Sequence, residues 1–251
     1  MKEEQGLYLS GAQVFVKECN ILITQPTIKQ IEIVGETDFL SAVQVIADPT
    51  IVTEPLAMGN SQLENAGDFQ LLIGILQADQ GVELREHMSA FAELCFPQYN
   101  IKIKGSNFSF SLKDDEEQVV CGMINPMNFD KFSQVVKDLF ISSTTNSDDF
   151  NPANDKAKEI ADKLKQGRKR VQTEKGNAEG AGSLFGLYVS ILSVGLPMDL
   201  NALMNYTPFQ VYDIFNRYSK KEEWDYYRRV SSMPFMDASK MEVDNWIENM
   251  Y

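Results

Sequence analysis

The sequence predicts an α+β protein in two parts. Residues 1–141 are expected to form an α+β domain with small antiparallel sheets, and residues 153–251 a helical domain. Three observations lead to this division. Short β-prone segments are confined to the first 121 residues, and apolar residues at helical spacing recur along the whole chain. Residues 142–152 are polar with little to bury, so we interpret them as a linker.

The composition restricts the class of protein. Of 251 residues, 43% are hydrophobic and 24% are charged, which is typical of a globular chain rather than a disordered one. No apolar run reaches the roughly 18 residues of a membrane span, and no apolar segment follows the acidic N-terminus. Three widely spaced cysteines, Cys19, Cys95 and Cys121, predict neither a disulfide framework nor a zinc site. We therefore expect a cytoplasmic protein that uses no membrane.

Short β-prone segments open the chain. Leu7–Leu9 and Gln13–Val16 are predicted as extended segments about a turn, and Asn20–Ile23 as a third. Pro26 then occupies a position that proline favours in a first helical turn, so Gln25–Glu36 is expected to begin a helix.

Three further helices are predicted before the next strands. Apolar residues at helical spacing define one from Phe39 to Ile46, and Pro49 ends it. A polar interval then reaches Asn65, where we expect no regular element. Asp68 is the predicted N-cap of the next helix, and Pro97 ends the one after it; both helices carry apolar residues that suit burial.

A three-stranded meander is predicted next. Its strands are Ile101–Lys104, Phe108–Leu112 and Gln118–Cys121, separated by a Gly-Ser-Asn turn and an acidic turn. Asn128 is then the expected cap of a helix whose apolar stripe runs from Phe129 to Phe140.

Beyond residue 152 every predicted element is helical. Thr207 is the predicted cap of one of these helices, with Pro208 at its first position and Val211, Tyr212, Phe215 and Tyr218 on one face. The expected helices are the basic helix 153–171, Ser183–Ser193, Asp199–Asn205, one beginning at Thr207, Glu222–Val230 and Val243–Met250.

The basic helix is the first candidate for binding. Between Asp155 and Lys175 there are eight Lys and Arg residues against four Asp and Glu, although the whole chain has a net charge of −13. One interpretation is a solvated amphipathic helix. The other is a docking element for an acidic partner or for the acidic surface of another copy, where charge would mainly raise the association rate. The basic residues concerned include Lys163, Arg168, Lys169 and Arg170.

An aromatic cluster is the second candidate. Most aromatic residues of a globular chain belong to its core, but the density of this cluster beside two arginines also matches the composition of interface anchors. Part of it is therefore a candidate partner-binding groove, comprising Phe209, Tyr212, Phe215, Tyr218 and Trp224.

No pattern of catalytic or metal-binding residues is visible. The single histidine, His87, lies at the edge of an apolar stripe and suits a structural or surface role. The acidic run Asp114–Glu117 lacks the spacing of a calcium loop and suits a solvated turn. Phosphate-binding, dinucleotide and zinc-protease motifs are absent from the sequence. We expect no cofactor, no metal and no enzymatic activity.

Three stretches carry a family resemblance. The first and second are Gln25–Lys29 with Phe39, and Asn151–Asp155 with Ala161–Leu164. The third runs from Ser183 to Asp213 and includes Leu200, Leu203, Thr207 and Asp213. In this order they resemble a protein from the tail-gene region of tailed phages and prophages of Gram-positive bacteria, and the third is similar to the C-terminal segment of phage tail assembly chaperones. Many such chaperones are shorter, so the resemblance leaves the β-containing part unexplained.

The resemblance implies a non-enzymatic chaperone that binds the tape measure protein, or another tail protein, in the host cytoplasm. A strongly acidic chain would keep an aggregation-prone partner dispersed. The alternative is a structural protein of the phage tail or baseplate, located in the virion. A DNA-binding regulator with a helix-turn-helix over Ser183–Tyr218 is disfavoured, because only Arg217 would serve its recognition face. The net charge likewise disfavours nucleic acid as a partner.

Overall fold

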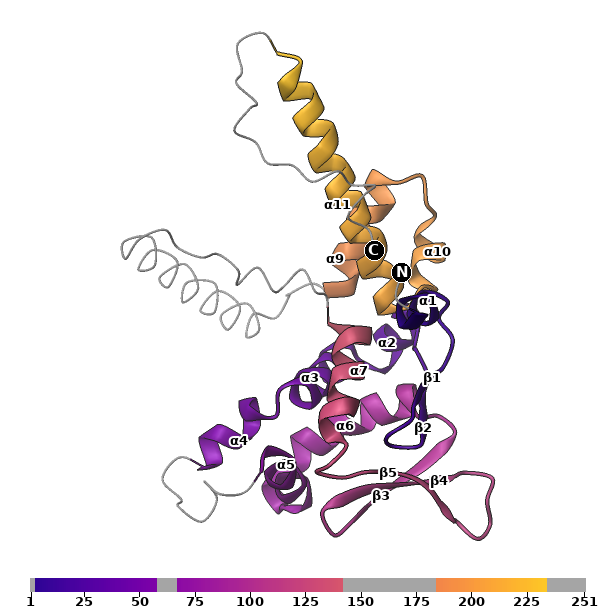
Figure 1. The fold of residues 1–251 in the computed structure, drawn as a ribbon, viewed down its shortest axis with the longest axis vertical. Coiled ribbons are helices and arrows are strands. Elements are labelled where there is room, and N and C mark those ends of the chain that lie inside the picture. Colours follow the sequence, from indigo (N-terminus) through magenta and orange to yellow (C-terminus); the bar gives the residue numbers. More distant parts are fainter. Residues whose placement is uncertain (1–2, 58–66, 142–183, 234–251) are drawn as a thin grey trace.

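The structure, a computed structural model, describes residues 3–57, 67–141 and 184–233. Its fold is α+β: every described strand lies between residues 14 and 124, and residues 184–233 are helical (Figure 1). The first half comprises α1 (Glu3–Leu9), β1 (Val14–Val16), β2 (Ile21–Ile23), α2 (Ile28–Val34), α3 (Glu36–Ala47), α4 (Thr50–Ala57) and α5 (Asp68–Gln77). The remaining elements are a 3-10 turn (Asp79–Gly81), α6 (Val82–Cys95), β3 (Tyr99–Lys104), β4 (Asn107–Leu112), β5 (Val120–Ile124), α7 (Phe129–Phe140), α9 (Leu184–Gly195), α10 (Leu200–Met204) and α11 (Pro208–Ser231).

Two antiparallel sheets form, as the sequence predicts. β1 pairs with β2, and β3, β4 and β5 form the meander in chain order. The turn of the first hairpin is held against β5, because Met123 N–H donates to Cys19 O over 2.9 Å. Gly122 lies at this approach, where a methyl carbon attached to its Cα would stand 2.6 Å from Asn20 O. Only glycine lets the two sheets come this close.

Helix α3 is the centre of the core. Its Phe39 is fully buried and meets Phe140 of α7 edge-on, with ring centroids 5.3 Å apart. Phe91 of α6 packs on the same ring at 5.7 Å. On the other side, the apolar face of the meander contributes Phe110, whose ring lies 5.1 Å from that of Phe96. The sheet therefore closes one side of a helical core rather than forming a core of its own.

The C-terminal helices pack on the first part of the chain. Ile28 N–H donates to Tyr206 O over 2.9 Å, and Gln210 Nε2 donates to Leu9 O over 2.7 Å. Phe185 N–H donates to the carboxylate of Glu36. Buried residues of α9 and α11 belong to one continuous hydrophobic cluster with those of α2 and α3. These contacts fix where α9 and α11 stand on the molecule.

Several predicted elements are confirmed with small shifts. Thr27 caps α2 through a capping box with Gln30, which explains why the β-branched run after it stays helical. Helix α5 begins at Asp68 itself, with Gly67 in the cap position, and α6 ends at Cys95, two residues before Pro97.

Three expectations about local structure are wrong. Leu7–Leu9 is helical, because Tyr8 is buried and packs edge-on against Phe209 of α11, a contact that local pattern cannot reveal. Helix α4 lies in the interval expected to lack regular structure. The predicted helices from Thr207 and over Glu222–Val230 are one continuous helix, α11. No proline or glycine interrupts it after Pro208.

The predicted linker 142–152, the basic helix 153–171 and the helix Val243–Met250 fall outside the described residues. The division into two domains therefore stays a prediction.

Candidate functional site

Helix α9 carries apolar side chains on two of its faces, and Ser190 is exposed beside the second. Its twelve residues, LFGLYVSILSVG, include no charged side chain. One face is built into the core through Phe185, Val189 and Leu192, each at most 1% exposed. The opposite face carries four aliphatic side chains at spacings of three and four residues, which a helix brings onto one stripe. We call Leu184, Leu187, Ile191 and Val194 the exposed α9 face.

The exposed α9 face is open to solvent. Val194 is 90% exposed and Leu187 is 57% exposed, while Leu184 and Ile191 are about four-tenths exposed. A surface helix of a globular protein normally turns its apolar stripe to the core and charged or polar residues to the solvent, whereas α9 turns aliphatic residues to both. Contiguous exposed aliphatic groups on a globular protein mark sites where another surface packs. Inspection of the sequence missed this face, and the signal that could have found it is the absence of any charge over Leu184–Gly195.

Two of the aromatic residues expected to form a groove, Tyr212 and Phe215, pack against α9. Tyr212 is 7% exposed, and its ring stands 5.9 Å from Phe185 and 5.3 Å from Tyr188. Burial, with smaller contributions from Tyr188 and Glu36, raises the pKa of Tyr212 well above its ordinary value. Phe215 meets Tyr188 edge-on at 4.6 Å. These two residues hold α9 on α11 and so set the direction of the exposed face.

Two further members of the cluster anchor α11 at other points. Phe209 packs against Tyr8 of α1, with ring centroids 5.4 Å apart. The phenol of Tyr218 lies over Gly195 at the end of α9, where a side-chain carbon on the glycine would overlap the hydroxyl. A residue without a side chain at the end of α9 therefore leaves room for the ring of Tyr218.

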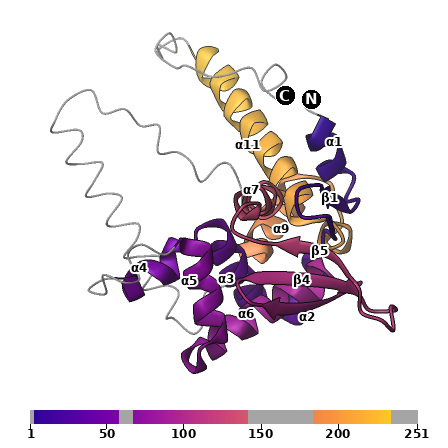
Figure 2. The same ribbon diagram turned by 60° about the horizontal axis from the view of Figure 1, so that its bottom comes forward.

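The C-terminal half of α11 extends beyond α9 and α1 (Figures 1 and 2). Trp224 is half-buried against Tyr227, with ring centroids 5.8 Å apart, and Tyr226 is exposed. Lys221 Nζ donates to Asp225 Oδ2 over 2.9 Å one turn away, which lowers the pKa of Asp225. This extension presents aromatic rings and charges together, as protein interfaces commonly do.

The predicted site residues therefore divide into three groups. Phe209, Tyr212, Phe215 and Tyr218 pack against neighbouring helices, and Trp224 lies on the extension of α11. Lys163, Arg168, Lys169 and Arg170 lie outside the described residues. Direct contact of any of them with a partner stays a prediction.

His87 has a clear structural partner. Its Nδ1 lies 2.9 Å from Asp38 Oδ1, which ties α6 to α3, and its Nε2 lies 3.9 Å from Glu83 Oε1. The described part of the chain contains no group of three His, Cys, Asp or Glu side chains placed to hold a metal ion. Among the described helices, none is both long and apolar enough to cross a bilayer.

The chain matches no family model, no curated protein and no solved structure.

Proposed function

We propose that this protein is a non-enzymatic tail assembly chaperone of a tailed phage, and that it binds a helical segment of the tape measure protein through the exposed α9 face. The observation that carries the proposal is a charge-free helix with four aliphatic side chains on its solvent side. Helices that pack on one another do so through side chains spaced in this way. The tape measure proteins that tail assembly chaperones bind are long, hydrophobic and helical, so such a partner would offer the matching surface.

The expected energy of the contact is moderate. Full burial of one Leu, Ile or Val side chain contributes about 1.5–3 kcal/mol. Scaling this range by the exposed fractions of the four side chains gives roughly 3–7 kcal/mol. Association itself costs a similar amount or more, so the exposed α9 face would act as the central part of a larger interface. The rings on the extension of α11 are candidates for the rest.

Charge supports the same role. The complex would keep the −13 charge of the chaperone, and mutual repulsion would hold such complexes apart in the host cytoplasm. The basic segment with Lys163, Arg168, Lys169 and Arg170 would then add attraction to acidic parts of the partner.

The test is co-expression with the tape measure protein of the same phage, followed by pull-down and size-exclusion chromatography. We expect the wild-type chain to recover soluble tape measure protein, and Leu187→Asp with Val194→Asp to abolish recovery. The control is Ile33→Asp on α2, which also replaces an exposed aliphatic residue of a helix, 75% exposed, but lies on another element. Unchanged thermal melting would show that the variants fold.

Two results would count against the proposal. If the variant with both aspartates still recovers soluble tape measure protein, the exposed α9 face is not part of the interface. Absence of any complex, together with detection of this protein in purified virions, would favour the alternative, a structural protein of the tail or baseplate.

A further inference from the structure

Strand β3 is an edge of the three-stranded sheet. It pairs with β4 on one side, and no described strand pairs with it on the other. A two-residue turn at Gly105, where φ is +60°, joins β3 to β4, so Lys104 and Asn107 beside it form a pair whose backbone groups hydrogen-bond to each other. In an antiparallel ladder such hydrogen-bonded pairs alternate with pairs whose backbone groups point outward. The N–H and C=O groups of Ile101 and Ile103 therefore point away from β4. Within the described residues, these four groups have no hydrogen-bond partner.

An apolar groove lies along one face of this edge. It has a volume of about 260 Å³ and is formed between the sheet and α6. Ile101 and Ile103 contribute one wall, and Met88 and Ala92 contribute part of the other. Arg85 also lines the groove, and its guanidinium donates to Leu76 O and Ala78 O over 2.9 and 2.7 Å. Most of the other lining residues are apolar, so the groove is suited to apolar side chains.

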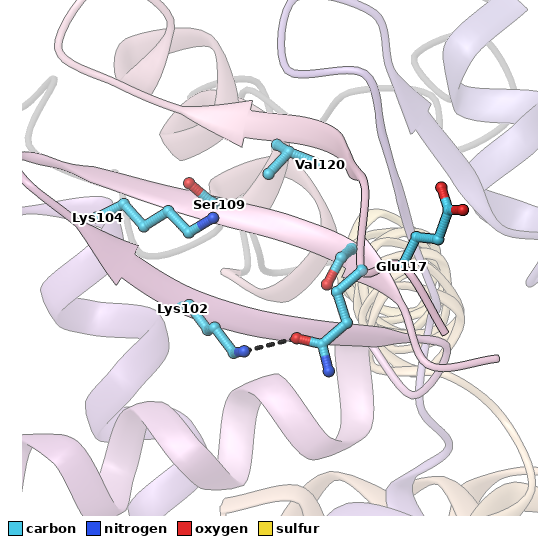
Figure 3. A pocket seen from close by; sticks show the side chains of 7 residues that line it. Lys102, Lys104, Ser109, Glu117 and Val120 are labelled. Atoms are coloured by element: carbon cyan, nitrogen blue, oxygen red, sulfur yellow. Dashed lines mark hydrogen bonds between the residues drawn. The ribbon is translucent and has the colours of Figure 1, made fainter. Parts of the chain in front are cut away.

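The opposite face of the same strand is polar and carries two lysines. Lys102 and Lys104 line a hollow of about 240 Å³, together with Ser109 on β4 and the single carboxylate of Glu117 before β5 (Figure 3). The two ammonium groups outnumber this carboxylate. Ser109 is buried at the floor of the hollow, while Lys102 and Lys104 are exposed. Lys102 Nζ donates to Gln118 Oε1 over 2.7 Å, while Lys104 has no hydrogen bond or ion pair among the described residues. A group that enters this side would meet a free ammonium.

We propose that β3 binds an extended segment of a partner protein in which apolar residues alternate with acidic residues. A strand added to this edge would hydrogen-bond to Ile101 and Ile103 through its backbone. Because side chains of a strand alternate between faces, every second residue would enter the apolar groove and the others would face Lys102 and Lys104. The backbone supplies the attraction, and the two faces together select the sequence. This surface shares no residue with the exposed α9 face, and the inference does not rest on the proposed function.

The lysines explain why the edge does not pair indiscriminately. Charged side chains, lysine above all, commonly prevent strand edges from joining to other copies or to apolar chains. The same two charges attract an acidic strand, since opposite charges on adjacent strands favour pairing. Lys102 and Lys104 thereby favour negatively charged segments over neutral or positively charged ones.

The test uses the full chain and a fluorescent peptide with the central sequence Val-Glu-Val-Asp-Ile-Glu. We expect saturable binding, measured by anisotropy, that weakens at least tenfold when alternate peptide nitrogens are methylated. We expect a similar loss for the double variant Lys102→Glu, Lys104→Glu. The double variant Lys17→Glu, Lys29→Glu makes the same change in net charge at exposed sites and should bind as wild type. Hydrogen exchange should show new protection of the Ile101 and Ile103 amides when the peptide binds.

Three outcomes would overturn the proposal. The first is equal binding of the methylated peptide, which excludes backbone pairing. The second is an equal loss of peptide affinity in both double variants, which would show that the net charge of the protein, and not the position of the lysines, determines binding. The third is protection of the Ile101 and Ile103 amides that grows with protein concentration and needs no peptide, because a second copy of this chain would then occupy the edge.

Discussion

Replacing Gly122 by alanine tests the contact between the two sheets. A methyl carbon at this position would lie 2.5 Å from Ile21 Cγ2, 2.6 Å from Asn20 O and 2.9 Å from Cys19 O. Two of the three are backbone atoms of a turn, which cannot move aside as the end of a side chain can. The turn must therefore shift, and the bond from Met123 N–H to Cys19 O is weakened with it.

The loss of stability in Gly122→Ala has two sources, the steric overlap and the weakened hydrogen bond. Overpacking in a well-packed region costs about 1–3 kcal/mol, and loss of one backbone hydrogen bond adds about 0.5–1.5 kcal/mol. We expect Gly122→Ala to lower the free energy of unfolding by roughly 2–4 kcal/mol. Urea unfolding followed by circular dichroism measures this as a lower midpoint with an unchanged slope.

Gly74 provides the matched control. It lies within α5 on an exposed position, and nothing stands within 4 Å of a methyl group placed on it. Alanine is the better helix former by about 1 kcal/mol, so Gly74→Ala should raise the unfolding midpoint. The reasoning would be refuted if Gly122→Ala left the midpoint unchanged, or if both substitutions destabilised the protein equally.

Three more predictions concern the core, a helix cap and a buried thiol. Phe39→Ala should cost about 3–5 kcal/mol in unfolding free energy, because the ring is fully buried against Phe91 and Phe140; a midpoint loss no larger than that of a surface substitution would contradict this. Thr27→Ala should cost about 1 kcal/mol through loss of the α2 capping box, and Thr27→Ser should restore most of it in the same denaturation assay. Burial raises the pKa of Cys19 from 9.0 to about 11, so the thiol ionises more readily in the unfolded chain than in the folded protein. The free energy of unfolding should therefore fall as pH rises from about 9 to 11, and Cys19→Ala should remove that part of the pH dependence.

Much of the fold could be predicted because its signals are local. The meander is visible in the alternation of residues 101–112, and α7 in the stripe from Phe129 to Phe140. Where the prediction of local structure is wrong, contacts between distant residues decide. Leu7–Leu9 carries too few residues to specify a conformation, and Tyr8 becomes helical where Phe209 covers it. Helix α4 has no local apolar stripe strong enough to reveal it.

The candidate site shows the same limit. The sequence identified the aromatic residues of α11 but could not say which way their rings point. The structure places Tyr212 and Phe215 against α9, so α9 rather than these rings of α11 presents the exposed aliphatic stripe. Two helices that are both rich in apolar residues can pack together in several orientations about their own axes. Only contacts with the rest of the protein select one of these orientations.

By itself, the sequence determined the α+β class, the acidic balance and the positions of most helices and strands, since propensity, spacing and charge are properties of neighbouring residues. Tertiary structure alone decided that Gly122 is a point of contact between sheets, that one face of α9 remains open, and that β3 is an edge with lysines on one side and a groove on the other. Each of these features depends on contacts between residues that are far apart in the sequence. Such contacts decide which side chains are buried and which stay exposed, and a short stretch of sequence does not reveal them.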